Sequence, residues 1–292
     1  MTILAPATSA NLGPGFDSLG LAIKLHNTTK IKTQKFTQIS VRGEGAQNTW
    51  IKTNNTFVNI FNEIYSTLNN DKKKFHFDFE NNIPLSRGLG SSSAVIVGAI
   101  ASAYKMAGFA PSKQKVLDTA LKYESHPDNI APCVFGGFNA SIIEDGKVFS
   151  KKAHLDENLR AVLLIPDTAI STKKSRSLLP INYSVAECVN NLSHTGVLSA
   201  CFFSKDYKNL RIASRDAMHE ERRMQALPQL FIARKIAYEN GALLSTLSGS
   251  GSTFFNLCFK EDAPRISKAL ENEFNAYKVL ICELDNNGYE IS

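Results

Sequence analysis

The sequence predicts an α+β protein whose two halves each combine strands and helices, and three observations support this prediction. Segments with the two-residue alternation of strands and segments with the 3.6-residue period of helices are interleaved along the 292-residue chain. A content of 43% hydrophobic and 21% charged residues is typical of a folded core. A charged, polar stretch at Lys151–Asn158 separates the halves, so we predict domains at residues 1–155 and 156–292.

The first half is expected to mix strands and helices. Alternating and β-branched residues predict strands at Thr2–Ala7, Leu19–Thr33, Thr37–Arg42 and Phe75–Phe79. Helical spacing of apolar residues predicts helices at Thr56–Leu68, at the apolar run Val95–Ala103, and at Ser112–Tyr123, where Ser112 is a good N-cap. Two further strands, Gly136–Ile143 and Lys147–Ser150, form a predicted hairpin around Asp145-Gly146.

The second half continues the mixed pattern and contains no internal repeat. It opens with the strongly apolar strand Arg160–Ile165. Helices are expected at Ser184–Phe203, Tyr207–His219 and Gln229–Glu239. Strands at Ala242–Ser248 and Thr253–Phe259, a helix at Pro264–Asn275 and a strand at Lys278–Glu283 complete the predicted order.

The most informative segment covers residues 84–94, Pro-Leu-Ser-Arg-Gly-Leu-Gly-Ser-Ser-Ser-Ala, directly before an apolar helix. Gly88 and Gly90 lack a Cβ and let the backbone approach a ligand closely. The serine hydroxyls and the unpaired N–H groups of the first helical turn predict an anion site suited to a nucleotide phosphate, although a plain helix cap is the alternative. The segment is not a P-loop, because no Lys-Ser or Lys-Thr follows, and Ser93 occupies the third glycine position of a dinucleotide fingerprint.

Two other glycine-rich segments carry polar groups. Residues 6–17 form a compact turn with Asn11 and Asp17 six residues apart, and Leu247–Thr253 lies between two predicted strands. Each segment alone could be a tight turn. Together with the segment at residues 84–94, they predict three walls of one cleft.

Two polar segments in the neighbourhood of helices are open to two interpretations. Glu124, His126 and Asp128 lie within five residues, and the two carboxylates could hold Mg²⁺ or polarise a hydroxyl, or the segment could simply cap a helix end. His219 and Arg223 share a helical face at i,i+4. A solvated face with ion pairs is the simpler interpretation of the second pattern.

Composition excludes several classes of protein. The net charge of +6 and the pI near 9.0 suit an anionic substrate such as ATP, but the lysines are dispersed without a nucleic-acid motif, so no nucleic-acid partner is expected. No apolar run reaches ~18 residues and the start lacks a signal-peptide pattern, so no membrane partner is expected. Five scattered cysteines indicate reduced thiols in a cytoplasmic protein. The histidines show no zinc spacing, and no Gly-x-Ser-x-Gly occurs.

These segments together resemble the motifs of the GHMP small-molecule kinases, in the family's order and over nearly the whole chain. The Gly-Leu-Gly-Ser-Ser-Ala type loop is at Gly88–Ala94. The branch of the family whose substrate is L-homoserine has four further motifs, which this sequence matches at Ser9–Asp17, Glu124–Asn129, His219–Arg223 and Ser248–Thr253. Ser125 and Ser252 replace a usual glycine and proline; serine fits both turns, so activity is expected to persist.

The resemblance implies a two-domain fold and a reaction. The N-terminal half should be like ribosomal S5 domain 2 and the C-terminal half ferredoxin-like. The implied reaction is ATP-dependent phosphorylation of the side-chain hydroxyl of L-homoserine to O-phospho-L-homoserine, a step toward threonine, with Mg²⁺ as cofactor and a homodimer as the suggested assembly. The alternatives are a GHMP kinase for another small hydroxylated substrate, and a non-catalytic regulator that binds ATP and an amino acid.

The resemblance also assigns roles by position. Asn11, Asp17 and Asp128 would orient the reacting hydroxyl as catalytic residues, with His126 beside them at the ammonium and hydroxyl ends of the substrate. Thr172, Arg176 and the helix arginine, taken as Arg222, would hold the substrate carboxylate, and Gly249 would close the pocket. Ser92 and Glu124 would hold Mg²⁺, and adenine would lie near Thr56–Asn62. The residues that would surround ATP are Pro84, Leu85, Ser86, Arg87, Gly88, Leu89, Gly90, Ser91, Ser92, Ser93 and Ala94.

Overall fold

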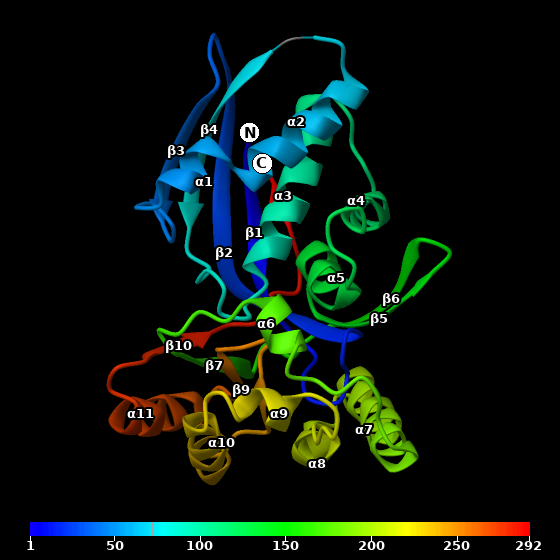
Figure 1. Cartoon of the computed structure of the whole chain (residues 1–292), viewed down its shortest axis with the longest axis vertical. Coiled ribbons are helices and arrows are strands. Elements are labelled where there is room, and N and C mark those ends of the chain that lie inside the picture. The colour runs from blue at the N-terminus through cyan, green and yellow to red at the C-terminus, as the bar shows by residue number, and fades with distance from the viewer. Residues whose placement is uncertain (72) are drawn as a thin grey trace.

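The computed structural model describes residues 1–71 and 73–292, and the strands of these residues form two sheets (Figure 1). The larger sheet has seven strands in the described residues, with the main order β11-β1-β2-β4-β3, and β2 also pairs with β5, which pairs with β6. Its neighbouring strands are antiparallel except β3 and β4. Its strands are β1 (Thr2–Ala10), β2 (Leu19–Gln34), β3 (Gln38–Gly43), β4 (Lys74–Asn81), β5 (Phe138–Glu144), β6 (Lys147–Ala153) and β11 (Glu290–Ile291).

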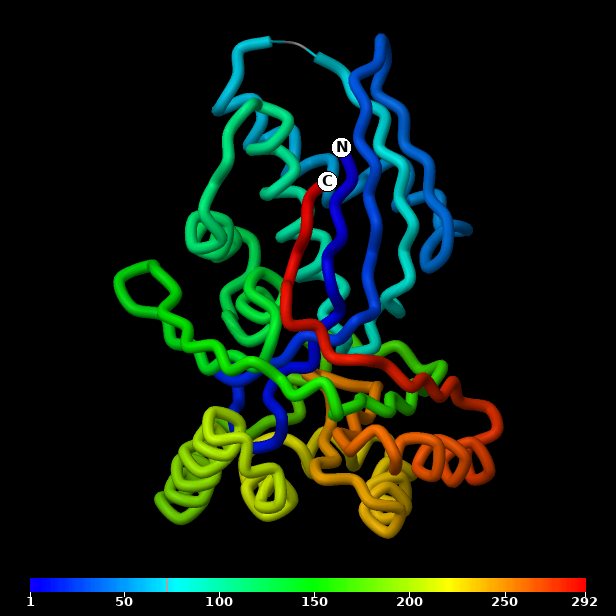
Figure 2. The backbone as a smooth tube through the Cα atoms, turned by 180° about the vertical axis from the view of Figure 1, so that it is seen from behind, coloured from blue at the N-terminus to red at the C-terminus, as the bar shows by residue number. Residues whose placement is uncertain are grey.

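Helices cover one face of this sheet. They are α1 (Thr49–Thr53), α2 (Thr56–Leu68), α3 (Ser91–Met106), α4 (Lys113–Ala120) and α5 (Pro127–Phe135). Figure 1 shows α2 and α3 in front of the strands, and Figure 2 shows the strands in front of these helices from the opposite side. Phe75, Phe77 and Phe79 alternate along β4 and meet Phe57 and Phe61 of α2 with ring centroids 5.0–6.1 Å apart. This aromatic layer joins α2 to the sheet.

The second sheet is formed by the second half of the chain and has the antiparallel order β10-β7-β9-β8. Its strands are β7 (Leu159–Ile165), β8 (Leu244–Leu247), β9 (Phe254–Phe259) and β10 (Lys278–Cys282). Its helical segments are α6 (Thr172–Arg176), α7 (Val185–Ser204), η1 (Tyr207–Asn209), α8 (Leu210–Ala213), α9 (Glu220–Met224), α10 (Gln229–Glu239) and α11 (Ala263–Glu273). Strands and helices in both halves confirm the α+β prediction, whereas the boundary at residues 155/156 stays a prediction.

The two ends of the chain lie side by side (Figure 2). β11 pairs with β1 at the edge of the larger sheet, and the backbones of Thr2 and Ser292 exchange two hydrogen bonds of 2.7 and 2.9 Å. The last residues therefore return from the second half to the first. Within the described part of the chain, no helix combines the length and apolar character needed to cross a membrane.

The predicted helix Tyr207–His219 is wrong beyond its first residues. The structure has η1 and α8 up to Ala213, and helical geometry resumes only at Glu220. The reason is Asp216, whose carboxylate accepts hydrogen bonds from the backbone N–H groups of Met218, His219 and Glu220 at 2.7–3.1 Å. A side chain that competes for these groups ends one helix and starts the next.

Candidate active site

The principal cavity, of about 520 Å³, lies between the two halves and has an apolar end and a charged end. Its walls come from all three glycine-rich segments, which confirms that the segments around Asn11, Gly88 and Gly249 surround one cleft. Side chains from α1, α2 and β4 form the apolar end, and side chains near α5, α6 and α9 form the charged end. The lining therefore combines features suited to a ring, a phosphate chain and a charged small molecule.

The segment at residues 84–94 forms the middle of the cavity. Its helix, α3, begins at Ser91, and the N-cap Gly90 has left-handed backbone geometry (φ 63°). A Cβ at Gly90 would lie 1.9 Å from Thr8 Oγ1, so only glycine lets the loop pass so close to β1. Ten of the eleven predicted residues line the cavity; Ala94 is the exception, because it is buried in the first turn of α3 and its N–H bonds to Gly90 O at 3.0 Å.

This loop is held in place by the second half of the chain. Arg87 donates from Nε to Pro166 O at 2.8 Å and from a terminal nitrogen to Asp167 O. Ser248 Oγ donates to Gly88 O at 2.7 Å, and the N–H of Thr253 donates to Arg87 O at 3.0 Å. The turn between β8 and β9 therefore supports the loop at residues 84–94.

At the charged end, Asn11 and Asp17 are held by an unusual backbone. Both residues have positive φ, 70° and 58°, a backbone conformation that Asn and Asp adopt more readily than most other residues. The Asn11 amide accepts a hydrogen bond from the N–H of Asp17 at 3.0 Å and donates to Gly249 O at 3.1 Å. Asp17 Oδ1 is 2.5 Å from the guanidinium of Arg176. The predicted positions Asn11, Asp17, Arg176 and Gly249 are thus brought together in one network.

The segment from Glu124 to Asp128 faces the same network. His126 Nδ1 lies 3.1 Å from Glu124 Oε1, and His126 Nε2 lies 3.7 Å from Asp17 Oδ2. The hydrogen bond to Glu124 raises the pKa of His126, and the charge of Asp17 adds to this effect against the opposing effect of burial. Residue 126 is also the N-cap of α5, but its side chain makes no capping hydrogen bond. The segment therefore starts a helix without a side-chain cap and also lines the cavity, and its role in a site stays a prediction.

Asp128 is the most deeply placed carboxylate of the site. It lies in the first turn of α5, is 5% exposed, and lines the cavity. Burial, followed by the negative charge of Asp17, raises the pKa of Asp128 to about 7. Among the described residues, the one side-chain hydrogen bond that its carboxylate accepts is long, 3.4 Å, from Asn129 Nδ2. The carboxylate is available to a ligand and can change protonation near neutral pH.

The arginine at this end requires a correction. Arg222 does not line the cavity; it is paired with Glu187 at 2.6 Å and donates to Ala217 O and Met218 O. The next residue, Arg223, is buried and lines the cavity. Residues at successive positions of a helix point about 100° apart, so only one of the pair can face the site. The His-x-x-x-Arg spacing already pointed to position 223, but the assignment chose its neighbour.

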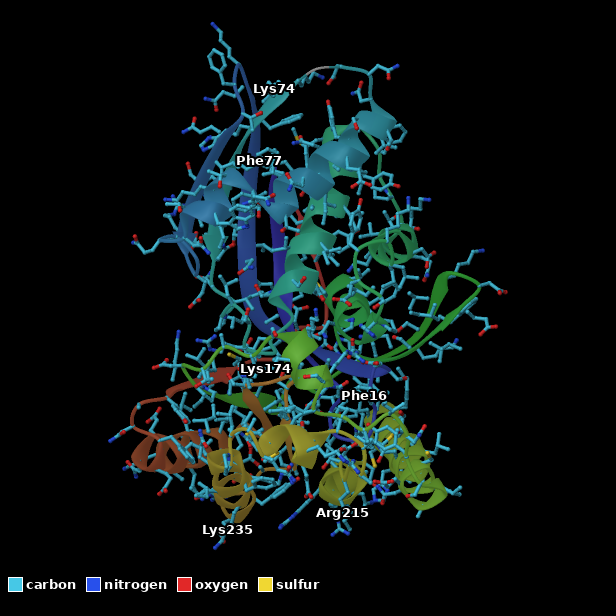
Figure 3. The ribbon with its side chains drawn as sticks, viewed as in Figure 1. Phe16, Lys74, Phe77, Lys174, Arg215 and Lys235 are labelled. Carbon is cyan, nitrogen blue, oxygen red and sulfur yellow. The ribbon has the colours of Figure 1, made fainter. Side chains whose placement is uncertain are left out.

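His219 and Phe16 fix the position of Arg223. Arg223 Nη1 lies 3.2 Å from His219 Nδ1, and His219 Nε2 lies 2.8 Å from Gly13 O. Burial lowers the pKa of His219 to about 4, so the ring is neutral and accepts at Nδ1 while donating at Nε2. The ring of Phe16, which is labelled in Figure 3, has its centroid 5.1 Å from the guanidinium carbons of both Arg176 and Arg223. The two arginines are therefore held on one aromatic platform.

The apolar end contains residues that the sequence analysis missed. The adenine prediction Thr56–Asn62 is only partly supported, because Thr56 and Phe57 line the cavity and the remainder of that range does not. The other apolar lining residues are Trp50, Ile51, Phe79, Leu85 and Val95. Trp50 is the only tryptophan of the chain and is 65% exposed beside the cavity, which is a signal that the sequence could have offered.

The remaining predicted positions, Thr172, Ser92 and Glu124, also line the cavity. Ser92 and Glu124 offer a hydroxyl and a carboxylate, which are hard oxygen donors suited to Mg²⁺. Across residues 1–71 and 73–292, no group of three or more His, Cys, Asp or Glu side chains could by itself hold a metal ion. The donors present fit an ion that takes most of its ligands from phosphate and water.

Comparison with known proteins identifies the family. The model of the GHMP kinase N-terminal domain matches residues 55–137, and the model of the GHMP kinase C-terminal domain matches residues 187–276. The chain belongs to the GHMP kinases, and the predicted GHMP kinase two-domain fold is confirmed.

Within this family the chain belongs with the homoserine kinases. It is 56% identical to the homoserine kinase of Campylobacter concisus over 100% of this chain and 99% of that protein, and 57% identical to that of Campylobacter fetus over 99% of both. The crystal structure of homoserine kinase from Cytophaga hutchinsonii superposes with a TM-score of 0.89 at 25% identity, covering 100% of this chain and 97% of that one.

Proposed function

We propose that this protein catalyses the ATP-dependent phosphorylation of the side-chain hydroxyl of L-homoserine, yielding O-phospho-L-homoserine and ADP. One observation carries the proposal: the cavity that contains the phosphate loop ends in a cluster with both carboxylates and guanidinium groups. An amino acid is a zwitterion, and its two charged ends need partners of both signs. Sugars or polyols need neither.

The carboxylate end of the substrate is assigned to Arg223 and Arg176, with the Thr172 hydroxyl beside them. The two guanidinium groups share the Phe16 platform, which fixes their direction before the substrate arrives. A planar guanidinium can bond both oxygens of a carboxylate at once. Gly249 closes this side of the pocket, where its carbonyl is already bonded to Asn11 and Arg223 at 3.1 Å.

The ammonium and the reacting hydroxyl are assigned to Asp17, Asp128 and Asn11, with His126 beside them. The two carboxylates provide the negative charge that an ammonium requires. Phosphoryl transfer depends on positioning and charge stabilisation more than on a strong base, so orientation of the hydroxyl by Asn11 and an aspartate is the main contribution of these residues. Asp128, with its raised pKa, is the group placed to accept the hydroxyl proton.

The nucleotide phosphates are assigned to the loop at residues 84–94 and to the free N–H groups at the start of α3. Ser92 and Glu124 would hold Mg²⁺, which when bound neutralises phosphate charge. The adenine is assigned to the apolar end, between Trp50 and Phe57. We also place the protein in the cytoplasm, because its five cysteines are all free thiols, as a reducing compartment requires.

A substrate panel tests the activity. ADP release from Mg-ATP is measured with purified protein and L-homoserine, D-homoserine, L-serine, L-threonine, mevalonate, galactose or shikimate. Turnover largely confined to L-homoserine supports the proposal. Turnover on another compound instead reassigns the charged end, and no turnover on any compound while ATP still binds favours a regulator.

Trp50 gives an independent measure of nucleotide binding. Because it is the only tryptophan and lies at the apolar end, its fluorescence should change when ATP or ADP is added. The Trp50→Phe variant is the control for signal from other sources. An unchanged Trp50 signal at saturating nucleotide would contradict the placement of adenine.

A further inference from the structure

The structure has a second cavity, of about 430 Å³, which shares no lining residue with the candidate active site. Its walls come from α7 to α10, from the segments between them and from β8. A neighbouring hollow of about 330 Å³ shares Arg211, Arg234 and Tyr238 with it, and we call the two together the arginine groove. In Figure 3 Arg215, another residue of the wall, lies at the end of the molecule away from the larger sheet. The size of the groove suits a small molecule.

The carboxylates that line the larger part of the groove already have partners within the protein. Asp216 accepts hydrogen bonds from three backbone N–H groups and from a side-chain amide at 2.7–3.1 Å. Glu220 is 3% exposed, accepts a hydrogen bond from the N–H of Leu247 and lies 2.9 Å from the guanidinium of Arg234. Glu221 lies 3.6 Å from the same guanidinium. These partners offset the negative charge of the wall, so little of it remains for a cationic ligand.

Two arginines of the groove differ from these carboxylates. With the rest of residues 1–71 and 73–292, the side chains of Arg211 and Arg215 make no hydrogen bond and no ion pair. They are four positions apart at the end of α8, and therefore one helical turn apart. The guanidinium carbon of Arg211 is 4.3 Å from the centroid of the Tyr238 ring. A single exposed arginine is ordinary, whereas two unpaired guanidinium groups on one concave surface concentrate positive charge there.

We propose that the arginine groove binds a small dianion, a phosphate monoester or a dicarboxylate, through Arg211 and Arg215. Each guanidinium is a planar fork that can bond two oxygens, and two such forks require two negative charges. A monoanion would leave one guanidinium without a partner. An amino acid is disfavoured as well, because its ammonium would find the carboxylates of the wall already paired.

The segment 211–216 also contacts the loop at residues 11–17. A Cβ on Gly13 would lie 2.1 Å from Ser214 O, so the loop and the segment pack backbone against backbone. At the end of the segment, Asp216 holds the first N–H groups of α9. A dianion that joins the two arginines orders this segment, and the groove can thereby act on the loop from a separate site.

Isothermal titration calorimetry of the full chain tests the proposal. Inorganic phosphate and succinate are the two dianion probes, and acetate at the same ionic strength is the monoanion control. A non-hydrolysable ATP analogue, present with Mg²⁺ at saturation, keeps the probes away from the loop at residues 84–94. We expect one molecule of phosphate or of succinate to bind per chain, and no saturable heat with acetate. The probe that binds more tightly shows which class of dianion the groove prefers.

Substitutions assign the bound probe to the groove. Arg215→Met and Arg211→Met should each weaken its binding about tenfold or more, because each removes a charged hydrogen-bond donor. Lys268→Met removes one positive charge from the exposed surface of α11, outside the groove, and is the matched control. Since salt screens so distant a charge, it should change the affinity less than about twofold. Arg223→Met, in the candidate active site, should also keep the probe bound. Circular dichroism confirms that each variant is folded.

Hydrogen–deuterium exchange tests the connection to the loop. With the probe bound, the backbone amides of residues 11–17 should exchange more slowly in the wild type, because the segment on which the loop packs opens less often. In Arg215→Met the same concentration of probe should leave their exchange rates unchanged. Exchange in β4, which does not contact the groove, is the internal reference.

Each outcome decides a part of the proposal. The absence of saturable binding of either dianion to the wild type, or an equal loss of binding in Lys268→Met and Arg215→Met, overturns the groove as a site. Loss of binding in Arg223→Met alone assigns the probe to the candidate active site and also overturns it. Acetate binding as tight as that of the dianions overturns the ligand class. Unchanged exchange of residues 11–17 with the probe bound overturns the effect on the loop. None of these measurements needs turnover, so their failure is distinguishable from a failure of homoserine phosphorylation.

Discussion

Arg223 and Arg222 are adjacent, and replacing each with methionine tests the assignment of the substrate carboxylate. Methionine keeps an unbranched side chain and removes the charge. Arg223 is 4% exposed and lines the cavity, whereas Arg222 is paired with Glu187 at the surface. A hydrogen bond to a charged group contributes ~1.5–3 kcal/mol, and ~1.4 kcal/mol corresponds to a tenfold change in binding. Arg223→Met should therefore raise the KM for homoserine about 10- to 150-fold.

The assay is coupled ADP release with homoserine varied at saturating Mg-ATP, and then with ATP varied at saturating homoserine. The KM for ATP should change much less than the KM for homoserine, because Arg223 lies at the charged end and not beside the apolar end. Arg222→Met should leave both KM values nearly unchanged, because Arg222 does not line the cavity. The loss of its ion pair with Glu187, whose side chains are 33% and 29% exposed, should cost only ~0–1 kcal/mol of stability. A larger homoserine effect for Arg222→Met than for Arg223→Met would refute this reasoning. Thermal unfolding of both variants separates loss of binding from loss of fold.

Three further predictions concern the carboxylates and the loop. Burial raises the pKa of Asp128 to about 7 in the folded protein. The free energy of unfolding should therefore fall as the pH rises from about 4 to 7, because the buried carboxyl must ionise. Homoserine affinity should rise over the same range, because the ionised carboxylate attracts the substrate ammonium. In the Asp128→Asn variant, the pH dependence of stability and the pH dependence of the KM for homoserine should both be weaker. Unfolding and KM measurements at several pH values check this, and unchanged pH profiles would show that Asp128 causes neither dependence. Glu124→Ala should strongly raise the Mg²⁺ concentration needed for half-maximal activity, whereas an unaltered Mg²⁺ titration would remove Glu124 from the metal. Gly90→Ala should weaken ATP binding, measured by titration with Trp50 fluorescence as the signal, because the added Cβ would meet Thr8 Oγ1 at 1.9 Å. Gly108 is the control, because it also has a positive φ but a Cβ there would meet open space. Gly108→Ala should cost only ~1 kcal/mol of stability and leave ATP binding intact.

Elements with strong local signals could be predicted from the sequence. The helix Gln229–Glu239 was predicted with its observed bounds, and β4 was recognised from the alternating Phe75, Phe77 and Phe79. The glycine-rich segments could be placed in one cleft because three of them, all with polar groups, occur in one chain. In each case the residues that specify the element lie within the element itself.

The missed features depend on contacts between distant residues. The break before Glu220 comes from Asp216, whose partner Asn191 is 25 positions earlier. The choice between Arg222 and Arg223 depends on the direction of α9, and this follows from the hydrogen bond between His219 and Gly13. The apolar end required α1 and β4 to meet across the sheet. The local signals for these features were limited to the His-x-x-x-Arg spacing, which points to Arg223, and to the single tryptophan, Trp50.

The hydrogen bond between Ser248 and Gly88 joins two residues that the ribosome adds to the chain at very different times. The ribosome releases the first half of the chain early, with its complete glycine- and serine-rich loop, but the hydroxyl of Ser248 and the N–H of Thr253 that support the loop are made some 160 residues later. A nascent chain therefore carries the loop without its support. We therefore expect that the chain can hold ATP only after the turn at residues 248–253 has left the ribosome, when the residues assigned to the substrate are also in place.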